Sequence, residues 1–336
     1  MREMLRLIVQ LAILGLIFLA VVPLAAVLIF GQLGQAEGPD LQLPFKNRVK
    51  TPDTITVWLE DQNKAVTVDF EDYVCRVVAS EMPATFEEEA LKAQSVAART
   101  FATAKIEKYK EKKPEAHPKA PVCSTTHCQV YKTEKALISS HEEGWEENGW
   151  EKIKKACKAT EGQLLYYDGE MVLQPLFFSS SGGQTENSED VFVSAVPYLV
   201  SVSSPYEENA THRDEKTKLS LKDFAKKLKE AFPEKDLGKI SRPSIKILSR
   251  TAGGRVEKMQ VGDGADGILK GTEVRMALGL SSALFAIEFD GSNIVFTSSG
   301  SGHGVGMSQY GADGMAKEGY TYKEILTHYY SGTQVY

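Results

Sequence analysis

The pattern of apolar and polar residues in Val68–Ala104 predicts two helices that meet at a sharp corner. Asp69 precedes the first helix and can accept hydrogen bonds from its free amides. Pro83 lacks the amide needed to continue a helix and biases the residue before it away from helical geometry. The first helix therefore ends at or just after Glu81. One face of it carries Phe70, Val74, Val77 and Glu81.

A second helix is expected directly after this corner. Thr85 and Glu88 have the spacing of a capping box, in which each side chain satisfies a free amide of the first turn. Small side chains dominate the apolar stripe of this helix and permit a neighbouring element to approach closely. The stripe consists of Phe86, Ala90, Ala93, Ala97, Phe101 and Ala104.

Glu81 is the candidate catalytic residue of this corner. Val77, Val78 and Met82 surround it in the sequence, and burial among apolar groups disfavours a charged carboxylate. Its pKa is therefore expected to be raised, as a general acid requires. The alternative is that Glu81 only ends a helix and accepts hydrogen bonds from backbone amides.

The remaining pattern predicts an α+β fold: a catalytic core of helices and β-hairpins, with an inserted lobe. Alternating residues predict β-hairpins in residues 54–68, 163–172, 244–262 and 286–297, and residues 219–232 form a basic amphipathic helix. The expected domain limits are 51–203 for the first part of the core, 204–285 for the lobe and 286–336 for the second part of the core.

The N-terminus reads as a membrane anchor. Leu7–Phe30 is almost entirely apolar, and its 24 residues span about 36 Å as a helix, enough for a hydrocarbon core of about 30 Å. Arg2 and Arg6 precede it and favour a cytoplasmic N-terminus. Residues 1–30 are therefore expected to be a transmembrane signal anchor, followed by a linker over 31–50. A cleavable signal peptide is the alternative, but its apolar region is normally shorter.

Four potential metal ligands lie within twelve residues: His117, Cys123, His127 and Cys128. Two thiolates and two imidazoles suit the tetrahedral preference of zinc, and a closed site of this kind is structural. A Cys123–Cys128 disulfide is the alternative that an extracytoplasmic compartment permits. The state of Cys75 and Cys157 stays open, as buried thiols or as a pair.

Two serine- and glycine-rich loops follow predicted strands, at residues 179–183 and 298–308. Glycines permit close approach of the backbone to a ligand, and hydroxyls can bond its polar groups. The second loop lacks the Gly-Lys-Ser/Thr of a phosphate loop, and the chain has no Gly-x-Ser-x-Gly nucleophile elbow. The formal net charge of -6 argues against general binding of nucleic acid, which requires a basic face.

Three stretches of the sequence resemble the stage II sporulation protein D family of cell-wall lytic transglycosylases. They are SEMPATFEEEALKAQSVAARTFA, FFSSSGGQTE and SGHGVGMSQYGADGMAKEGYTYKEILTHYYSGT, and they keep the order of the family's motifs. The resemblance implies that Glu81 is the catalytic glutamate. It also implies that a set of polar residues binds substrate: Arg99, Ser180, Ser181, Gly182, His303, Ser308 and Gln309.

The substrate implied by this resemblance is the peptidoglycan glycan strand, cut between N-acetylmuramic acid and N-acetylglucosamine. A hydrolase of glycosides usually needs two carboxylates, whereas a lytic transglycosylase needs one and closes an anhydro ring without water. Partners implied are the stage II sporulation proteins M and P, in the engulfment step of sporulation. The implied location is the mother cell membrane, with the catalytic domain outside and facing the forespore. The alternative function is a non-catalytic scaffold that binds the cell wall.

Overall fold

The computed structural model describes residues 48–336, and within this part the fold is mixed α+β, as expected. The predicted membrane anchor at 1–30 and nearly all of the predicted linker lie outside the described residues. Among residues 48–336, no helix has the length and apolarity needed to cross a membrane. The anchor therefore stays a prediction.

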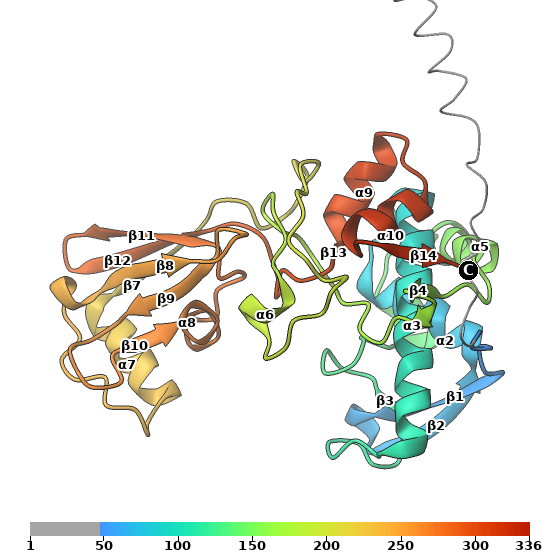
Figure 1. Ribbon diagram of the computed structural model, residues 1–336, viewed down its shortest axis with the longest axis horizontal. Coiled ribbons are helices and arrows are strands. Elements are labelled where there is room, and N and C mark those ends of the chain that lie inside the picture. Colours follow the sequence, from blue (N-terminus) through green and yellow to red (C-terminus); the bar gives the residue numbers. More distant parts are fainter. Residues whose placement is uncertain (1–47) are drawn as a thin grey trace, which may run out of the picture. The chain divides into compact units, whose positions relative to one another are not determined.

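A long central helix, α3 (Glu88–Glu111), organises the first part of the fold (Figure 1). It contacts α2 (Phe70–Glu81), α5 (Glu151–Ala159), α9 (Gln309–Lys317) and α10 (Tyr322–Tyr329). Its residues from Ala93 to Ala104 are buried on all faces, not only along the predicted stripe. A helix that is buried all round belongs to the interior of a core, and here the core extends from β1 to the C-terminal strand.

The corner between the two helices differs from the prediction in one respect. Helix α2 is capped by Asp69, which accepts from the amide of Asp72, and it ends at Glu81 as expected. Helix α3, however, begins at Glu88 and has no side-chain cap, so the Thr85–Glu88 capping box is wrong. A tertiary contact replaces it, because the amide of Glu87 donates to Asp313 of α9 at 2.8 Å.

Short strands and helices cover this helical core. The remaining elements of the core are β1 (Thr54–Leu59), the 3-10 turn η1 (Glu60–Gln62), β2 (Lys64–Asp69), β3 (Val122–Cys123), α4 (Glu134–Ser139), the π-helical turn η2 (Glu146–Trp150), β4 (Leu165–Tyr167), β5 (Glu170–Met171), β6 (Phe177–Phe178), α6 (Ser188–Val191), β13 (Met307–Ser308) and β14 (Thr333–Val335). Their sheets have the orders β2-β1-β3, β14-β4-β5 and β13-β6. The predicted hairpins at 54–68 and 163–172 are confirmed as β1–β2 and β4–β5.

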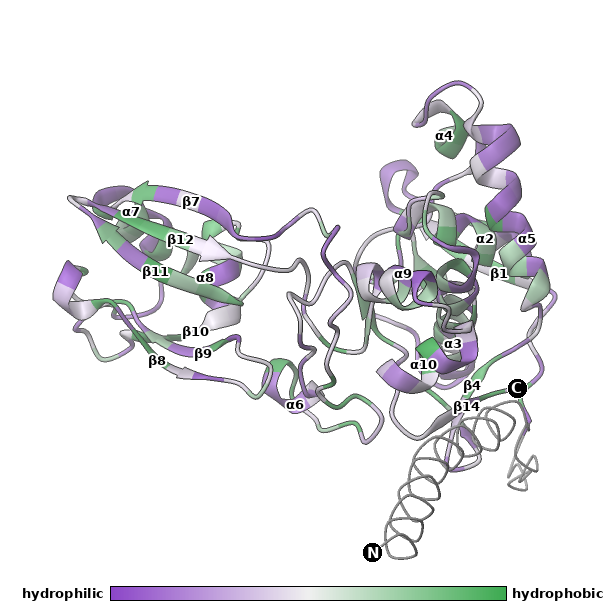
Figure 2. Ribbon diagram, turned by 90° about the horizontal axis from the view of Figure 1, so that it is seen from above, coloured by the Kyte–Doolittle hydropathy of each residue, from purple (hydrophilic) through white to green (hydrophobic). Residues whose placement is uncertain are grey.

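The inserted lobe has a hydrophobic cluster of its own, built on two three-stranded sheets and two helices. Its elements are β7 (Glu215–Ser220), α7 (Leu221–Ala231), the 3-10 turn η3 (Arg242–Ser244), β8 (Lys246–Arg250), β9 (Val256–Gln260), β10 (Ile268–Lys270), α8 (Gly271–Leu278), β11 (Phe285–Asp290) and β12 (Asn293–Ser298). Along β12, buried residues alternate with half-buried ones, and Figure 2 colours part of this strand as hydrophobic. The period of two buries Ile294 and Phe296 in the lobe.

The hairpin β11–β12 forms where the sequence predicted it, but with other partners. The sequence predicts that this hairpin belongs to the second part of the core. In the structure, β12 pairs antiparallel with β7, and both strands of the hairpin pack into the hydrophobic cluster of the lobe. Alternation identifies a hairpin but not the sheet that it joins, so this pairing was invisible in the sequence. The chain returns from the lobe to the core after β12, through residues 299–306. The domain limits themselves stay a prediction.

Candidate active site

Glu81 lies at the last position of α2, where three distant segments of the chain meet. Its Oε1 accepts a hydrogen bond of 2.7 Å from the amide of Val130. Gln309 lies near enough to stabilise the charged carboxylate, although its Nε2 has no hydrogen-bond partner among the described residues. Met82 is extended (ψ 139°) and almost fully buried, which ends the helix beneath the carboxyl group. Val130 of a loop and Gln309 of α9 therefore cover the helix corner that the sequence predicted.

Burial raises the pKa of the Glu81 carboxyl above its ordinary value. The hydrogen bond from Val130 and the nearby amide of Gln309 stabilise the charged form and oppose this rise, but burial is the larger effect. The expected direction is thus confirmed. Glu81 also accepts a hydrogen bond from a backbone amide, as expected if it only ends a helix. That amide, however, belongs to Val130 of a separate loop and not to its own helix end.

The four predicted metal ligands are brought together. The ligand atoms of His117, Cys123, His127 and Cys128 all lie within 4.8 Å of one another, and both cysteines are free thiols. Cys128 Sγ lies 3.4 Å from His117 Nε2 and 3.7 Å from His127 Nδ1. Around a tetrahedral zinc with Zn–S of about 2.3 Å and Zn–N of about 2.05 Å, neighbouring S and N ligands are about 3.6 Å apart. The spacing of the cluster is therefore close to what a bound metal ion requires.

The cluster also has the outer contacts that metal ligands require. His117 Nδ1 bonds to the carbonyl of Ala120 at 2.8 Å, which leaves Nε2 directed at the cluster. Cys123 lies in β3, which pairs parallel with β1. Val130, the donor to Glu81, follows Cys128 by two residues. The cluster therefore anchors the segment that contacts the candidate catalytic residue.

The two serine-glycine loops lie side by side. Strands β6 and β13 pair in parallel, and Ser180 and Ser301 exchange backbone hydrogen bonds of 3.1 and 2.8 Å. The amide of Glu186 donates to the carbonyl of Gly304 at 2.8 Å, which ties the loops together a second time. The sequence predicted each loop separately, and the structure joins them into one surface.

Glu207 joins both loops, and the sequence analysis missed it. Its carboxylate accepts from the amide and hydroxyl of Ser181, the amide of Gly182, and the hydroxyls of Ser204 and Ser308. These bonds are between 2.5 and 3.0 Å long, and the glutamate is 8% exposed. No local motif marks Glu207 in the sequence, because its five donors come from three separate segments.

These contacts change the roles expected for two serines. The side chains of Ser181 and Ser308 are fully buried and their hydroxyls are committed to Glu207, so they support the loops and do not face a ligand. Ser180 and Gly182 instead line a cavity of about 250 Å³ together with Glu207. The hydroxyl of Ser180 is itself buried and has no hydrogen-bond partner in the described structure, so in this conformation it does not face the cavity.

His303 also supports the loops and is not poised for acid–base chemistry. Its Nδ1 accepts from the amide of Val305 and its Nε2 donates to the carbonyl of Phe177, both at 3.1 Å. Burial lowers the pKa of His303 to about 4, so the ring is neutral near pH 7. Both ring nitrogens are used by the backbone, which leaves only the face of the ring for other contacts.

Arg99 lies in the core and not beside the loops, which contradicts its predicted role in substrate binding. It is fully buried in α3 and forms a bidentate ion pair with Glu71 of α2, with N–O distances of 2.7 and 2.8 Å. It also donates to the carbonyl of Cys157. A buried guanidinium that is paired and hydrogen-bonded in this way holds α2, α3 and α5 together. Gln309 is the predicted binding residue that does reach Glu81.

Comparisons with known proteins identify the class to which this fold and site belong. A family model described as Stage II sporulation protein matches residues 60–167, which contain Glu81 and the four His and Cys residues. A second model, described as a domain of unknown function, matches residues 200–306. The first match is a similarity to stage II sporulation proteins over less than half of the chain.

Individual relatives narrow this class. The chain is 37% identical over 288 residues to stage II sporulation protein D of Bacillus subtilis (strain 168), covering 85% of this chain and 79% of that protein. It is 36% identical over 287 residues to the protein of the same name from Bacillus amyloliquefaciens, with the same coverage. A protein named amidase enhancer, from Bacillus subtilis, is 30% identical over 304 residues, which are 76% of this chain and 39% of that protein. The chain belongs to the stage II sporulation protein D family, a family of sporulation proteins.

The network around Glu207 gives the first testable prediction. Replacing Glu207 with Ala leaves several buried donors without an acceptor, and each such donor costs about 1–3 kcal/mol. We expect Glu207→Ala to lower the free energy of unfolding by about 3 kcal/mol or more, measured by urea denaturation of the described region. The matched control is the exposed neighbour Glu208, for which Glu208→Ala should change stability by less than about 0.5 kcal/mol. Equal stabilities of the two variants would contradict the assigned network.

Proposed function

We propose that the protein is a peptidoglycan lytic transglycosylase that cuts glycan strands between N-acetylmuramic acid and N-acetylglucosamine during engulfment in sporulation. The observation that carries this proposal is the carboxyl of Glu81, half-buried at a helix corner with its pKa raised. Membership of the stage II sporulation protein D family supports the biological setting. A raised pKa increases the fraction of the carboxyl that is protonated at a given pH, which favours general acid catalysis.

In the proposed mechanism Glu81 acts twice. The protonated carboxyl first donates its proton to the glycosidic oxygen, and the bond between that oxygen and C1 of the muramyl residue breaks. The resulting carboxylate then takes the proton from the 6-hydroxyl of the same muramyl residue, whose oxygen bonds to C1. An anhydro-muramyl product forms, no water is consumed, and Glu81 is protonated again. One acid with a pKa near the working pH can perform both transfers.

The neighbouring carboxylates support a mechanism with one acid. Glu207 is bonded to five donors of the loops. Asp313 accepts from the amide of Glu87 and pairs with Lys317 at 2.5 Å. Both carboxylates therefore form hydrogen bonds or ion pairs that stabilise the fold. A hydrolase needs a second carboxylate that is free to activate water or to attack the sugar, and neither of these two is free.

Glycan recognition is assigned to the paired loops and the cavity beside them. Ser180 and Gly182 belong to its wall, which is predominantly polar in its residues and suits the hydroxyl and acetamido groups of a glycan. Ser308 connects this wall to the acid, because it bonds to Glu207 and directly precedes Gln309. The proposed substrate contacts thus continue along the chain to the proposed catalytic residue.

We also propose that the His/Cys cluster binds zinc in a structural role. Two thiols and two imidazoles at tetrahedral spacing are the donor set that zinc prefers. A metal there would fix the segment that carries the amide of Val130, and so would hold the hydrogen bond to Glu81. No step of the proposed proton transfer uses the metal.

The location and partners are further parts of the proposal. A transmembrane helix at residues 1–30 would tether the domain outside the mother cell membrane, facing the forespore. The partners proposed from the family resemblance are the stage II sporulation proteins M and P. The expected polymer partner is the glycan strand, and nucleic acid is not expected because the net charge is -6.

Digestion of purified, peptide-stripped glycan strands tests the reaction. The wild-type protein should release anhydro-muramyl products, identified by mass spectrometry. Glu81→Gln should lower the rate at least 100-fold, because the amide accepts the Val130 hydrogen bond but cannot supply the proton. We expect the fold of Glu81→Gln to stay intact, and circular dichroism and thermal unfolding check this.

The exposed Glu87 provides a matched control six residues further along the chain. Glu87→Gln should keep nearly the full rate, because only the backbone amide of this residue contacts the core. If wild type and Glu81→Gln bind the strands equally and neither cuts them, the protein is a non-catalytic scaffold. Hydrated, non-anhydro products would instead identify a hydrolase.

The pH dependence of cutting provides a second test. Gln309 stabilises the charged form of Glu81, so Gln309→Leu should raise the pKa of Glu81 further. Because the protonated acid is the active form at the first step, the rate falls as pH rises through this pKa. The basic limb of the kcat profile should therefore move to higher pH in Gln309→Leu. The matched control is the same substitution at the exposed Gln62. An unmoved basic limb of the kcat profile in Gln309→Leu would contradict the assigned effect of Gln309 on Glu81.

Metal analysis tests the proposed zinc site. Protein purified without chelators should contain about one zinc per chain. Removing the metal should lower the thermal midpoint by about 5 °C or more, because the ligand loop loses its closure. The variant Cys128→Ser should be less stable and should respond little to the chelator. Absence of metal from undenatured protein would refute the site, and loss of cutting with an unchanged thermal midpoint would indicate a catalytic metal instead.

A further inference from the structure

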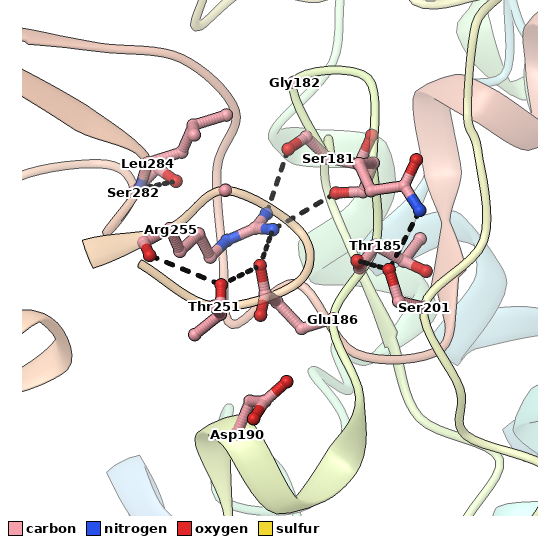
Figure 3. Close-up of polar contacts among 12 residues, drawn as sticks. Ser181, Gly182, Thr185, Glu186, Asp190, Ser201, Thr251, Arg255, Ser282 and Leu284 are labelled. Atoms are coloured by element: carbon pink, nitrogen blue, oxygen red, sulfur yellow. Dashed lines mark hydrogen bonds and ion pairs between the residues drawn. The ribbon is translucent and has the colours of Figure 1, made fainter. Parts of the chain in front are cut away.

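Arg255 of the inserted lobe reaches the base of the paired serine-glycine loops (Figure 3). It directly precedes β9, in the hairpin that joins β8 to β9, and is 2% exposed. Its Nη1 donates to the carbonyl of Gln184 at 3.2 Å and to Glu186 Oε1 at 3.1 Å. Its Nη2 donates to the carbonyl of Ser181 at 2.9 Å. A residue of the lobe therefore contacts the first loop at Ser181 and the segment directly after that loop at Gln184 and Glu186.

Arg255 and Glu207 hold opposite ends of one peptide group. The carbonyl of Ser181 accepts from Arg255, and the amide of Gly182 donates to Glu207 at 3.0 Å. Gly182 has φ +78°, a conformation that only glycine adopts readily. Glycine does not fix its own backbone angles, so the orientation of this peptide depends on the two charged side chains. Gly182 is also part of the cavity wall.

The surrounding backbone is shaped around the buried ion pair of Arg255 and Glu186. A Cβ at Gly304 of the second loop would lie 2.4 Å from Cζ of Arg255, and a Cβ at Gly253 would lie 2.2 Å from Oε1 of Glu186. Thr251 donates to the same oxygen at 2.9 Å. The pair thus contacts the hairpin and both loops at once, in space that any side chain at Gly304 or Gly253 would occupy.

Stability alone does not account for such a pair. Burying two charges costs solvation free energy. Replacing a buried ion pair with apolar residues of similar volume therefore often leaves the stability of the fold unchanged or raises it. The planar fork of arginine, by contrast, fixes directions, because its donors point to several acceptors at once. The contacts of Arg255 are directional and converge on the loop that borders the cavity.

We propose that Arg255 is a positioning residue through which the inserted lobe fixes the glycan-binding loop at Ser181–Gly182. It contacts no substrate in this proposal. It orients the Ser181–Gly182 peptide, and with it the wall of the cavity that carries Ser180. The inference rests on the proposed function, from which the glycan ligand is taken. The contact between Arg255 and the loop does not depend on the chemistry at Glu81.

Amide hydrogen exchange of the full chain tests the positioning directly. In Arg255→Met the amides of Ser181 and Gly182 should exchange at least about tenfold faster than in wild type, because the loop loses a charged donor. Arg255→Lys keeps the charge for Glu186 but lacks the fork, so it should give an intermediate rate. The matched control is Arg250, whose guanidinium donates only to Gly254 and Phe285 within the lobe. Arg250→Met should leave these amides unchanged.

Glycan kinetics supply the functional test. Arg255→Met should raise KM for peptide-stripped strands by about tenfold with a smaller change in kcat, and Arg250→Met should match wild type. Folded Arg255→Met with wild-type exchange and wild-type KM would overturn the proposal, as would equal losses in both variants. If Arg255→Met does not fold, Arg255→Lys decides by the same two readouts. If wild type neither cuts nor binds glycan, the proposed function fails, and the exchange rates alone decide whether Arg255 positions the loop.

Discussion

The packing around α3 is the constraint on which the rest of the structure depends. Its alanines are buried on several faces, and their small side chains permit α2, α5, α9 and α10 to approach it closely. This packing brings the end of α2 to the start of α9, so that Glu81 and Gln309 meet although most of the chain separates them. Bulky side chains on α3 would push these ends apart. The geometry of the candidate site is therefore set by the size of residues that take no part in it.

Two glutamates near the loops are placed in opposite environments. Glu81 has a backbone amide and one side chain to stabilise its charge, and burial dominates its pKa. Glu207 accepts hydrogen bonds from five donors, so its carboxylate is used in holding the two loops together. One carboxyl is therefore available to hold and release a proton, and the other organises the backbone. This separation of roles follows from the number of donors around each group and not from the residue type.

Local signals in the sequence predicted most elements of the fold. The cap at Asp69, the end of α2 at Glu81 and the hairpins arise from contacts between close neighbours in the chain, and these were correct. Four ligands within twelve residues revealed the metal cluster for the same reason. Long-range contacts were missed: Asp313 replaces the expected cap of α3, and Arg99 pairs with Glu71 in the core. Glu207 has no local motif at all, because its donors converge only after folding.

The loops also show why charged residues are buried next to glycines. A glycine-rich segment lets the backbone approach a ligand, but it gains this freedom by losing the side chains that would otherwise limit its conformations. Apolar packing cannot restore order where there are few side chains to pack. Directional hydrogen bonds to the backbone can, and Glu207 and Arg255 provide them from two sides of the Ser181–Gly182 peptide. Because Arg255 comes from the lobe, the insertion and the core are needed together to define one conformation of this loop.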